Sequence, residues 1–452
     1  MQKNRRLFLQ TAAATAVGSA LTACGGGGDA SPLVASSNAA DSASTSALAS
    51  ADARVRTSTT STPKSRVIVI GGGMGGATVA KYLRLWGDAI SVTLIERMPT
   101  YTSCIMSSLV LTGQRSMSSL YFNYDTLRSK YGITTVFGDV VAIDPVAVKV
   151  TLADGTVLGA DRIVMSPGIE FDAVPGLGTS DRMPHAWKAG PQTSLLASQL
   201  SAMPRGGVAI LTIPKTPYRC PPGPYERACL VADWLKSRKP GSKLIVLDAN
   251  PDIVTEKDNF TSAFLGVHGD VIEYVTNAEV TQADPGTMTL TTTAGNFRGD
   301  VINLIPRQRA GSLVTTAGLN NATEGRFAGV NVLSYASTAA GAGKVHIIGD
   351  ASATTQPKAG HIANQEAKVC ADAVSRILAG GSPDPAPVTN SACYSTITMS
   401  KASWLTAVFQ YDPASATMKG VAAASGASTG WNGDNFDEMG KWFGYLMKDT
   451  FA

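Results

Sequence analysis

Short runs of apolar residues that end at a glycine, a proline or an acid recur along the chain, and they predict buried strands of parallel sheets. The first run, residues 67–70, reads Val-Ile-Val-Ile and leads into a glycine-rich turn at residues 71–76. The spacing of apolar residues over 74–85 then predicts a helix, and residues 92–96 predict a second strand. Strand, glycine turn, helix and strand in this order predict one βαβ unit of dinucleotide-binding shape.

The turn of this unit carries the G-x-G-x-x-G spacing at Gly71, Gly73 and Gly76. These glycines permit a tight turn, a close approach of the backbone to a pyrophosphate, and close packing of the helix on the strand. The helix directs its first N–H groups at the phosphates. Glu96, at the end of the second strand, is placed to accept hydrogen bonds from an adenosine ribose. The unit therefore predicts a site for a dinucleotide cofactor.

A second βαβ pattern lacks the features that bind a nicotinamide cofactor. Its strands are predicted at residues 207–213 and 243–248, around a helix at residues 225–235. The connecting turn, residues 214–224, is rich in proline, and proline has no N–H to offer a pyrophosphate. We therefore expect no NAD here, but a rigid loop that presents Cys220.

The first residues of the chain resemble an export signal. Residues 4–10 read Asn-Arg-Arg-Leu-Phe-Leu-Gln, which is typical of the twin-arginine route, and the apolar stretch that follows is too Ala-rich to be a good membrane span. Residues 21–24 resemble a lipobox, so Cys24 is either a lipid anchor or part of a signal that is cut later. The composition of residues 25–65, mostly Gly, Ala, Ser and Thr, predicts a flexible linker.

Composition and charge exclude several classes of function. With 452 residues, of which 44% are hydrophobic, the chain is long enough for two or three domains. Loss of Lys3, Arg5 and Arg6 with the signal would leave 35 Lys and Arg against 34 Asp and Glu, which argues against a nucleic-acid partner. No CxxCH motif occurs, so we expect no haem on this chain, and the four histidines show no metal-ligand spacing.

Several segments give the chain a resemblance to a known family. The most specific is Cys-Pro-Pro-Gly-Pro-Tyr-Glu-Arg at residues 220–227. Over residues 64 to 452 the chain resembles the flavoprotein subunit of flavocytochrome c sulfide dehydrogenase, a relative of sulfide:quinone reductases and glutathione reductase. The segments that carry the resemblance are 67–81, 101–107, 185–190, 218–228, 302–306, 349–351 and 390–395.

The resemblance implies a glutathione-reductase-like α/β fold with two Rossmann-type domains and a C-terminal capping or interface domain. After a signal at residues 1–24, we expect the FAD-binding domain at 66–180 and 306–380. A second Rossmann-like domain is expected at 181–305, and the interface domain at 381–452. The resemblance also implies FAD, a periplasmic location, and electron transfer to a c-type cytochrome subunit in a heterodimer.

Two residues are candidate contacts of the flavin by resemblance. In the family, the cysteine of a Tyr-Thr-x-Cys segment forms a thioether with the 8α-methyl of the flavin, and Cys104 matches this position. The alternative for Cys104 is a buried structural thiol. A strand that ends in Gly-Asp places its acid beside the ribityl chain in flavoproteins of this type, which makes Asp350 a candidate ligand; the alternative is a turn residue before a helix.

The family also carries a redox disulfide above the flavin, and Cys220 matches one of its members. The other is expected after the Gly-Asp-Ala motif, where this chain has Ser352. Three alternatives remain open. Cys220 acts alone as a persulfide carrier, with a pKa lowered by Arg219; it pairs with Cys229; or the sulfide chemistry is lost and the flavin serves another donor. Two further cysteines are interpreted as structural, namely Cys370 and Cys393.

Glu226, in the first turn of the predicted helix, is a candidate general acid or base, and the alternative is a solvated acid favoured by the helix dipole. We therefore expect a periplasmic FAD-dependent enzyme that oxidises sulfide or a related sulfur compound at Cys220 and reduces a c-type cytochrome. The alternative is a flavin electron-transfer protein of the same fold without sulfide turnover.

Overall fold

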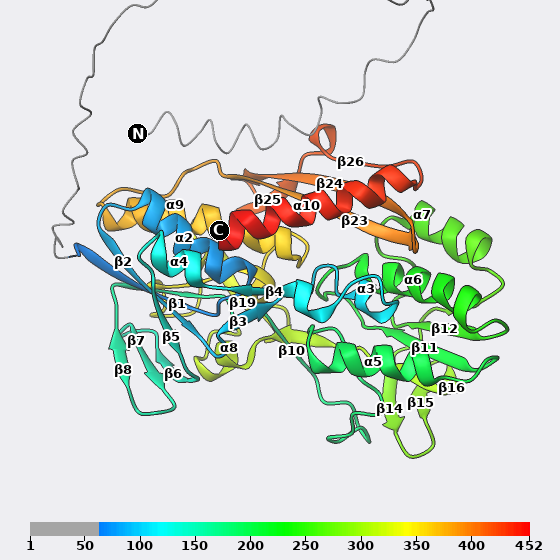
Figure 1. The fold of residues 1–452 in the computed structure, drawn as a ribbon. Helices are drawn as coiled ribbons and strands as arrows, with labels where there is room; N and C mark the ends of the chain where they lie inside the picture. The colour runs from blue at the N-terminus through cyan, green and yellow to red at the C-terminus, as the bar shows by residue number, and fades with distance from the viewer. Residues whose placement is uncertain (1–62) are drawn as a thin grey trace, which may run out of the picture. The chain divides into compact units, whose positions relative to one another are not determined.

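The computed structural model describes residues 63–452 (Figure 1). The predicted signal, Cys24 and nearly all of the predicted linker lie outside the described residues. Within residues 63–452, no helix has the length and apolar character needed to cross a bilayer. The same part of the chain contains no cluster of acid, histidine and cysteine side chains that could hold a metal ion.

The largest sheet has eight strands in the order β22-β19-β20-β21-β9-β1-β2-β5. Strand β1 pairs in parallel with β2 and β9, and its apolar run is buried on both faces. The two chain segments predicted to form the FAD-binding domain thus meet in one sheet. The strands are β1 (Ser65–Ile70), β2 (Ile90–Glu96), β5 (Thr134–Phe137), β9 (Arg162–Met165), β19 (Ala328–Asn331), β20 (Ala336–Ser337), β21 (Val345–Ile347) and β22 (Ser352–Ala353).

Helices α2 (Met74–Trp86) and α9 (Gly360–Leu378) lie side by side against this sheet, and α10 (Gly433–Phe451) lies over α2 (Figure 1). The close packing of α2 on β1 depends on Gly76, because a Cβ there would collide with the carbonyl oxygen of Gly71. Smaller elements border the sheet: β3 (Thr100–Thr102), α3 (Ser108–Leu111), β4 (Tyr121–Asn123), α4 (Asp125–Ser129), β6 (Val140–Asp144), β7 (Lys149–Leu152) and β8 (Val157–Gly159).

A second, four-stranded parallel sheet has the order β13-β12-β11-β17. Strands β10 (Ile169–Phe171) and β18 (Gln308–Ala310) pair where the chain passes between the two sheets. The second sheet and its neighbours comprise α5 (Pro191–Ala202), β11 (Val208–Ile213), α6 (Gly223–Arg238), β12 (Lys243–Asp248), α7 (Lys257–Ser262), β13 (Ile272–Val275), β14 (Val280–Asp284), β15 (Thr289–Thr292), β16 (Gly295–Arg298) and β17 (Val301–Asn303). Helix α8 (Ser312–Thr316) packs against β6 beside the first sheet.

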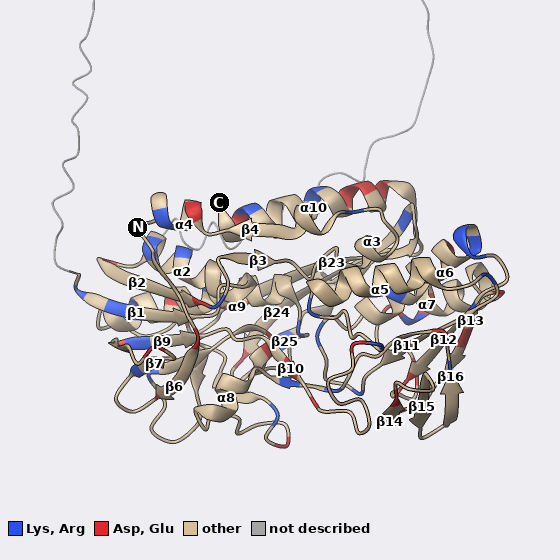
Figure 2. Ribbon diagram, turned by 60° about the horizontal axis from the view of Figure 1, so that its bottom comes forward, with Lys and Arg blue, Asp and Glu red and all other residues tan. Residues whose placement is uncertain are grey.

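The C-terminal region bridges the two sheets. Its long hairpin of β23 (Val388–Thr398) and β24 (Lys401–Asp412) continues into β25 (Thr417–Gly420) and β26 (Gly426–Ala427). Strand β23 packs against α6 of the second unit and against α9 of the first (Figure 1). Lys and Arg positions are interspersed with Asp and Glu positions along the described ribbon, with acids at the start of α10, where the helix dipole favours them (Figure 2).

Candidate active site

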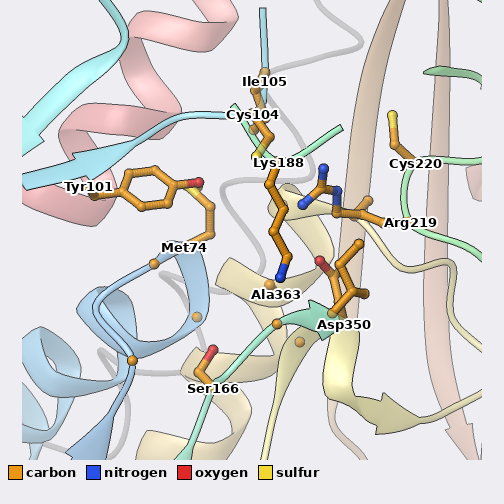
Figure 3. Close-up of a pocket in the computed structure, with 18 of the residues that line it drawn as sticks. Met74, Tyr101, Cys104, Ile105, Ser166, Lys188, Arg219, Cys220, Asp350 and Ala363 are labelled. Atoms are coloured by element: carbon orange, nitrogen blue, oxygen red, sulfur yellow. The ribbon is translucent and has the colours of Figure 1, made fainter. Parts of the chain in front are cut away.

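One cavity, of about 490 Å³, collects nearly all of the predicted site residues (Figure 3). It opens between the glycine turn after β1, the start of α6, the end of β21 and strand β23. Gly76 is the exception, because it lies behind the cavity, where it packs α2 on the sheet. The predicted residues that line the cavity are Gly71, Gly73, Glu96, Cys104, Cys220, Glu226 and Asp350.

The glycine turn leaves room for a phosphate group. Gly71 has φ +93°, a conformation that glycine adopts without strain. A Cβ at Gly73 would be 3.5 Å from its nearest neighbour, the ring of Tyr101, so the space beside Gly73 is open to the cavity. The carboxylate of Glu96 accepts hydrogen bonds from the backbone N–H groups of Gly72 and Arg97, which hold it at the end of β2.

Asp350 follows β21 and presents an unpaired oxygen. Its Oδ1 is buried and has no hydrogen-bond partner among the described residues. Burial raises the pKa of the Asp350 carboxyl, although the nearby cations Arg219 and Lys358 oppose this effect. A buried acceptor of this kind needs a donor, and the hydroxyl groups of a ribityl chain would provide one. The open glycine turn and Asp350 therefore fit a flavin dinucleotide in this cavity.

Cys104 lies in the turn that leads from β3 into α3. Its Sγ accepts a hydrogen bond from the backbone N–H of Ala189 at 3.4 Å, and its carbonyl oxygen accepts one from the hydroxyl of Ser107 at 2.7 Å. The thiol lines the cavity and is half-buried. The structure thus places Cys104 where its sulfur can reach a molecule bound in the cavity.

Cys220 sits in a constrained turn before α6, with φ +59°. Its N–H donates to the carbonyl oxygen of Lys358 at 2.6 Å. Burial raises the pKa of the Cys220 thiol, and the charges of Cys393 and Glu226 raise it further, while Arg219 only partly opposes them. Arg219 does lower the pKa of Cys220, but the prediction of a lowered pKa for this thiol is wrong, because desolvation outweighs the attraction of one cation.

Cys393, on β23, is a functional candidate that the sequence analysis interpreted as structural. It lines the same cavity as Cys220, and its charge is one of the causes that raise the pKa of the Cys220 thiol. Burial also raises the pKa of the Cys393 thiol, to about 12. The sequence did contain one indication that Cys393 is a site residue. It lies within residues 390–395, one of the segments that carry the family resemblance.

Ser352 does not face Cys220 across the cavity, so the prediction for this position is wrong. Strand β22 pairs with β19, and the Ser352 side chain is buried behind the cavity wall. Its hydroxyl donates to the carbonyl oxygen of Gly349 at 2.8 Å. Cys229 is also fully buried, in the core around α6, and does not line the cavity. Besides Cys104, the cysteine that shares the cavity with Cys220 is thus Cys393.

Glu226 faces the cavity from the first turn of α6, so it is not the solvated acid of the alternative interpretation. Its Oε1 accepts a hydrogen bond from the hydroxyl of Thr396, on β23, at 3.2 Å. Burial raises the pKa of Glu226 to about 7, while the Thr396 hydrogen bond and Arg227 lower it. A carboxyl group with this pKa can accept and release a proton near neutral pH.

The sequence analysis also missed the cation Arg227 and an aromatic wall. Arg227 is 1% exposed, donates to Asn303 Oδ1 at 3.0 Å, and lies over the ring of Trp187 at 4.7 Å. The C-terminal region lines the cavity with Tyr394 and Trp442, whose ring centroids are 5.8 Å apart. Arg227, Trp187 and Tyr394 lie within segments that carry the family resemblance, which was the signal that could have found them. No local motif marks Trp442, which only the tertiary fold brings to the cavity.

Solved structures with the same fold include sulfide:quinone oxidoreductase from Aquifex aeolicus, with a TM-score of 0.70 and 17% identity. That match covers 86% of this chain and 92% of the other. Putidaredoxin reductase, in its covalent complex with putidaredoxin, superimposes with a TM-score of 0.60 at 16% identity, over 77% of this chain and 87% of the other. These similarities confirm the predicted glutathione-reductase-like α/β fold.

Sequence comparisons identify the family. Residues 193–306 match the central region of the sulfide dehydrogenase [flavocytochrome c] flavoprotein chain, and residues 385–451 match the flavin-binding region of flavocytochrome c sulphide dehydrogenase. The flavoprotein chain from Chlorobaculum thiosulfatiphilum is 51% identical over 45 residues, which are 10% of this chain and 94% of that sequence. The chain belongs to the family of flavocytochrome c sulfide dehydrogenase flavoprotein chains. This confirms the resemblance seen in the sequence.

Part of this flavocytochrome c family member is shared more widely. Residues 65–190 match the pyridine nucleotide-disulphide oxidoreductases. The apoptosis-inducing factor homolog B of Dictyostelium discoideum is 34% identical over 105 residues, which are 23% of this chain. That match spans 25% of the length of the Dictyostelium protein.

Proposed function

We propose that the protein is an FAD-dependent dehydrogenase that oxidises sulfide, or a related small sulfur compound, at a redox pair formed by Cys220 and Cys393. The observation that carries the proposal is that both thiols and Glu226 line the cavity that also contains the dinucleotide-type glycine turn. Membership of the flavocytochrome c sulfide dehydrogenase family supports the choice of sulfide as the donor.

In this proposal Gly71, Gly73, Glu96 and Asp350 hold FAD, and Cys104 attaches it through a thioether. The flavin supplies a two-electron acceptor for the thiols when it is bound. The match of residues 385–451 to a flavin-binding region supports FAD. The half-buried thiol of Cys104, which faces the cavity, supports the attachment.

The chemistry begins with the oxidised Cys220–Cys393 pair. The sulfur of hydrosulfide forms a bond to one cysteine sulfur, the disulfide bond breaks, and the second cysteine leaves as a thiolate that carries the electron pair. Glu226 accepts the proton of the bound sulfur, since burial raises the pKa of its carboxyl to about 7. The fixed Cys220 turn and strand β23 hold the two sulfur atoms on the same side of the cavity.

The electrons then pass to an external acceptor, for which we propose a c-type cytochrome subunit in a heterodimer. The second βαβ unit offers little to a nicotinamide cofactor. At the end of β12, Asp248 is 0% exposed, and its carboxylate accepts hydrogen bonds from the hydroxyls of Tyr225 and Tyr274, each at 2.7 Å. Its Oδ1 accepts two further hydrogen bonds, from the backbone N–H and the side-chain amide of Asn250, so the carboxylate has no acceptor left for a ribose. The proposed location is the periplasm, reached by the twin-arginine route, with Cys24 as a possible lipid anchor site.

An anaerobic titration with sulfide, followed by flavin absorbance, tests this function. We expect sulfide to bleach the flavin of the wild-type protein and of Ser352→Ala, and to leave the flavin of Cys220→Ser and Cys393→Ser oxidised. If Cys393→Ser bleaches at the wild-type rate, Cys393 is not the partner of Cys220. If the wild-type flavin stays oxidised, the sulfide chemistry is excluded and the electron-transfer alternative is favoured.

A further inference from the structure

The inference concerns how Cys104 becomes reactive, and it rests on the proposed attachment of FAD to this residue. The nucleophile in such an attachment is the thiolate, not the thiol. In a partly buried site a thiolate forms readily only where a cation or a hydrogen-bond donor stabilises it. The backbone N–H of Ala189 is one such donor, at 3.4 Å from the sulfur. The remaining question is which cation faces the sulfur.

Arg219 lies between two of the three thiols that line the cavity, Cys104 and Cys220. In Figure 3 its guanidinium group lies between Cys104 and Cys220. Burial disfavours the charged form of Arg219, but Cys104, followed by Asp350 and Tyr101, raises its pKa above the usual value. The cation therefore stays charged inside the cavity, where it lies beside Cys104 and Asp350.

The side chain of Arg219 is oriented by its contacts with Trp187, and the rest of its guanidinium group can bind a ligand in the cavity. Within residues 63–452, the recorded hydrogen bond of its guanidinium is from Nη2 to the carbonyl oxygen of Trp187. The guanidinium also lies 5.7 Å from the centroid of the Trp187 ring. Trp187 thus fixes the direction of the side chain, while the other donor groups of the guanidinium remain available to an anion.

The three other cations that line the cavity are less suited to this role. Arg97 pairs with Asp139 at 2.5 Å. Lys188 pairs with Glu170 at 3.1 Å, and Figure 3 shows its ammonium group directed toward Ala363 and away from Cys104. Arg227 is held by Ser108, Asn303 and the carbonyl oxygen of Ala186. Its donors are thus committed to the protein.

We propose that Arg219 is the positioning residue for covalent flavin attachment, because its guanidinium stabilises and orients the thiolate of Cys104. In the attachment step one C–H bond of the 8α-methyl group breaks and one C–S bond forms. The flavin accepts the electron pair and becomes reduced, and the protons of the thiol and the methyl group go to the reduced ring or to solvent. The external electron acceptor of the proposed function then reoxidises the flavin.

The first experiment measures the fraction of flavin that stays on the full-length protein after acid denaturation. Removal of one nearby opposite charge changes an ionisation equilibrium by about tenfold or more. We therefore expect Arg219→Met to retain at most about a tenth of the wild-type covalent fraction after a fixed time with FAD. Arg219→Lys, which keeps the charge, should restore most of it. Lys188→Met is the matched control and should stay within about twofold of wild type.

A second experiment does not require bound flavin. In protein prepared from riboflavin-limited cells, we expect iodoacetamide to alkylate Cys104 about tenfold more slowly in Arg219→Met than in wild type or Lys188→Met. Peptide mass spectrometry locates the modified cysteine.

The outcomes separate the inference from the function on which it rests. If the wild-type protein carries no covalent flavin, the proposed attachment fails. If the wild type is covalent and Arg219→Met is equally covalent, the role of Arg219 is excluded. If Arg219→Met binds no flavin at all, the rate at which iodoacetamide alkylates Cys104 decides. A rate equal to that of the wild type excludes the proposed role of Arg219.

Discussion

Thr396, on strand β23, donates a hydrogen bond to Oε1 of Glu226, on helix α6, at 3.2 Å. This contact ties the C-terminal hairpin to the second parallel sheet at the wall of the cavity. It also acts on the chemistry, since it lowers the pKa of a carboxyl that burial raises to about 7. The neighbouring hydroxyl of Ser395 donates to Glu256 at 2.6 Å, and the charge of Glu256 in turn raises the pKa of Glu226.

Loss of the Thr396 hydrogen bond should move the pH dependence of sulfide oxidation. A base must be deprotonated to act, so the rate rises with pH through the pKa of Glu226. Thr396→Val removes a group that lowers this pKa, and we expect the rising limb to move about 0.5 to 1 unit toward higher pH. Stopped-flow measurement of flavin reduction by sulfide between pH 5 and 9 checks this.

Two variants complete the test of Glu226. Glu226→Gln should abolish the rising limb of the pH profile and should lower the rate of flavin reduction by about 10²-fold. Thr406→Val, which lies on β24 outside the cavity lining, should leave the limb in place. A limb that stays unmoved in both Thr396→Val and Glu226→Gln would assign the titration to another group.

A second buried carboxyl group, that of Glu366, should make the free energy of unfolding depend on pH. Glu366, on α9, is 1% exposed, and burial raises its pKa to about 7, although the N–H of Gly349 and the charge of Lys358 lower it. Because the folded pKa lies above the ordinary 4.5, the folded protein holds a proton that the unfolded chain releases. The stability is therefore full below pH 4.5 and falls as the pH rises toward 7.

Glu366→Gln should remove this loss. We expect its free energy of unfolding to exceed that of wild type by about 1 to 3 kcal/mol at pH 8, and by much less at pH 4.5. Urea unfolding followed by tryptophan fluorescence at the two pH values measures the difference. Glu438→Gln, on the exposed face of α10, is the control and should change neither value by more than about 0.5 kcal/mol. A gain of the same size at both pH values would contradict the assignment.

The sequence predicted the elements that local patterns define. The first βαβ unit, with Gly71, Gly73 and Glu96 at the cavity, follows from apolar runs and glycine spacing that act within one short segment. The proline-rich turn likewise located Cys220. Strand β12, predicted at residues 243–248, forms at Lys243–Asp248, because its apolar residues are bounded by polar ones.

The sequence could not supply the relationships that tertiary packing creates. Cys393 reaches the cavity only because β23 packs against α6 and α9. The residues next to Cys393 in the sequence do not indicate that it lies in the same cavity as Cys220. Ser352 was misplaced for the converse reason: its nearness in sequence to Asp350 suggested a cavity position, but strand pairing buries it. The pKa of Cys220 depends on desolvation, which requires knowledge of what covers the thiol.

Two glycines of the same turn should respond differently to alanine. A Cβ at Gly76 would collide with the carbonyl oxygen of Gly71, so we expect Gly76→Ala to lose about 3 kcal/mol or more of stability. A Cβ at Gly73 has 3.5 Å to its nearest neighbour, so Gly73→Ala should fold normally but fill the space proposed for the pyrophosphate. Melting temperature and the ratio of flavin to protein separate the two effects. A Gly73→Ala protein with wild-type flavin content would place the phosphates elsewhere.

The second unit should be unable to accept electrons from a nicotinamide cofactor. Both oxygens of Asp248 are occupied, Oδ2 by two tyrosine hydroxyls and Oδ1 by the backbone N–H of Asn250 at 2.9 Å and its side-chain amide at 2.8 Å, so no acceptor is left for a ribose. We therefore expect anaerobic NADH to leave the flavin oxidised over minutes, while dithionite bleaches it at once. Tyr274→Phe, which frees one lone pair of Asp248, should behave in the same way, because the proline-rich turn still offers no N–H groups to a pyrophosphate. Bleaching by NADH in the wild-type protein at a rate comparable with that of sulfide would show that this unit binds a nicotinamide in spite of its turn.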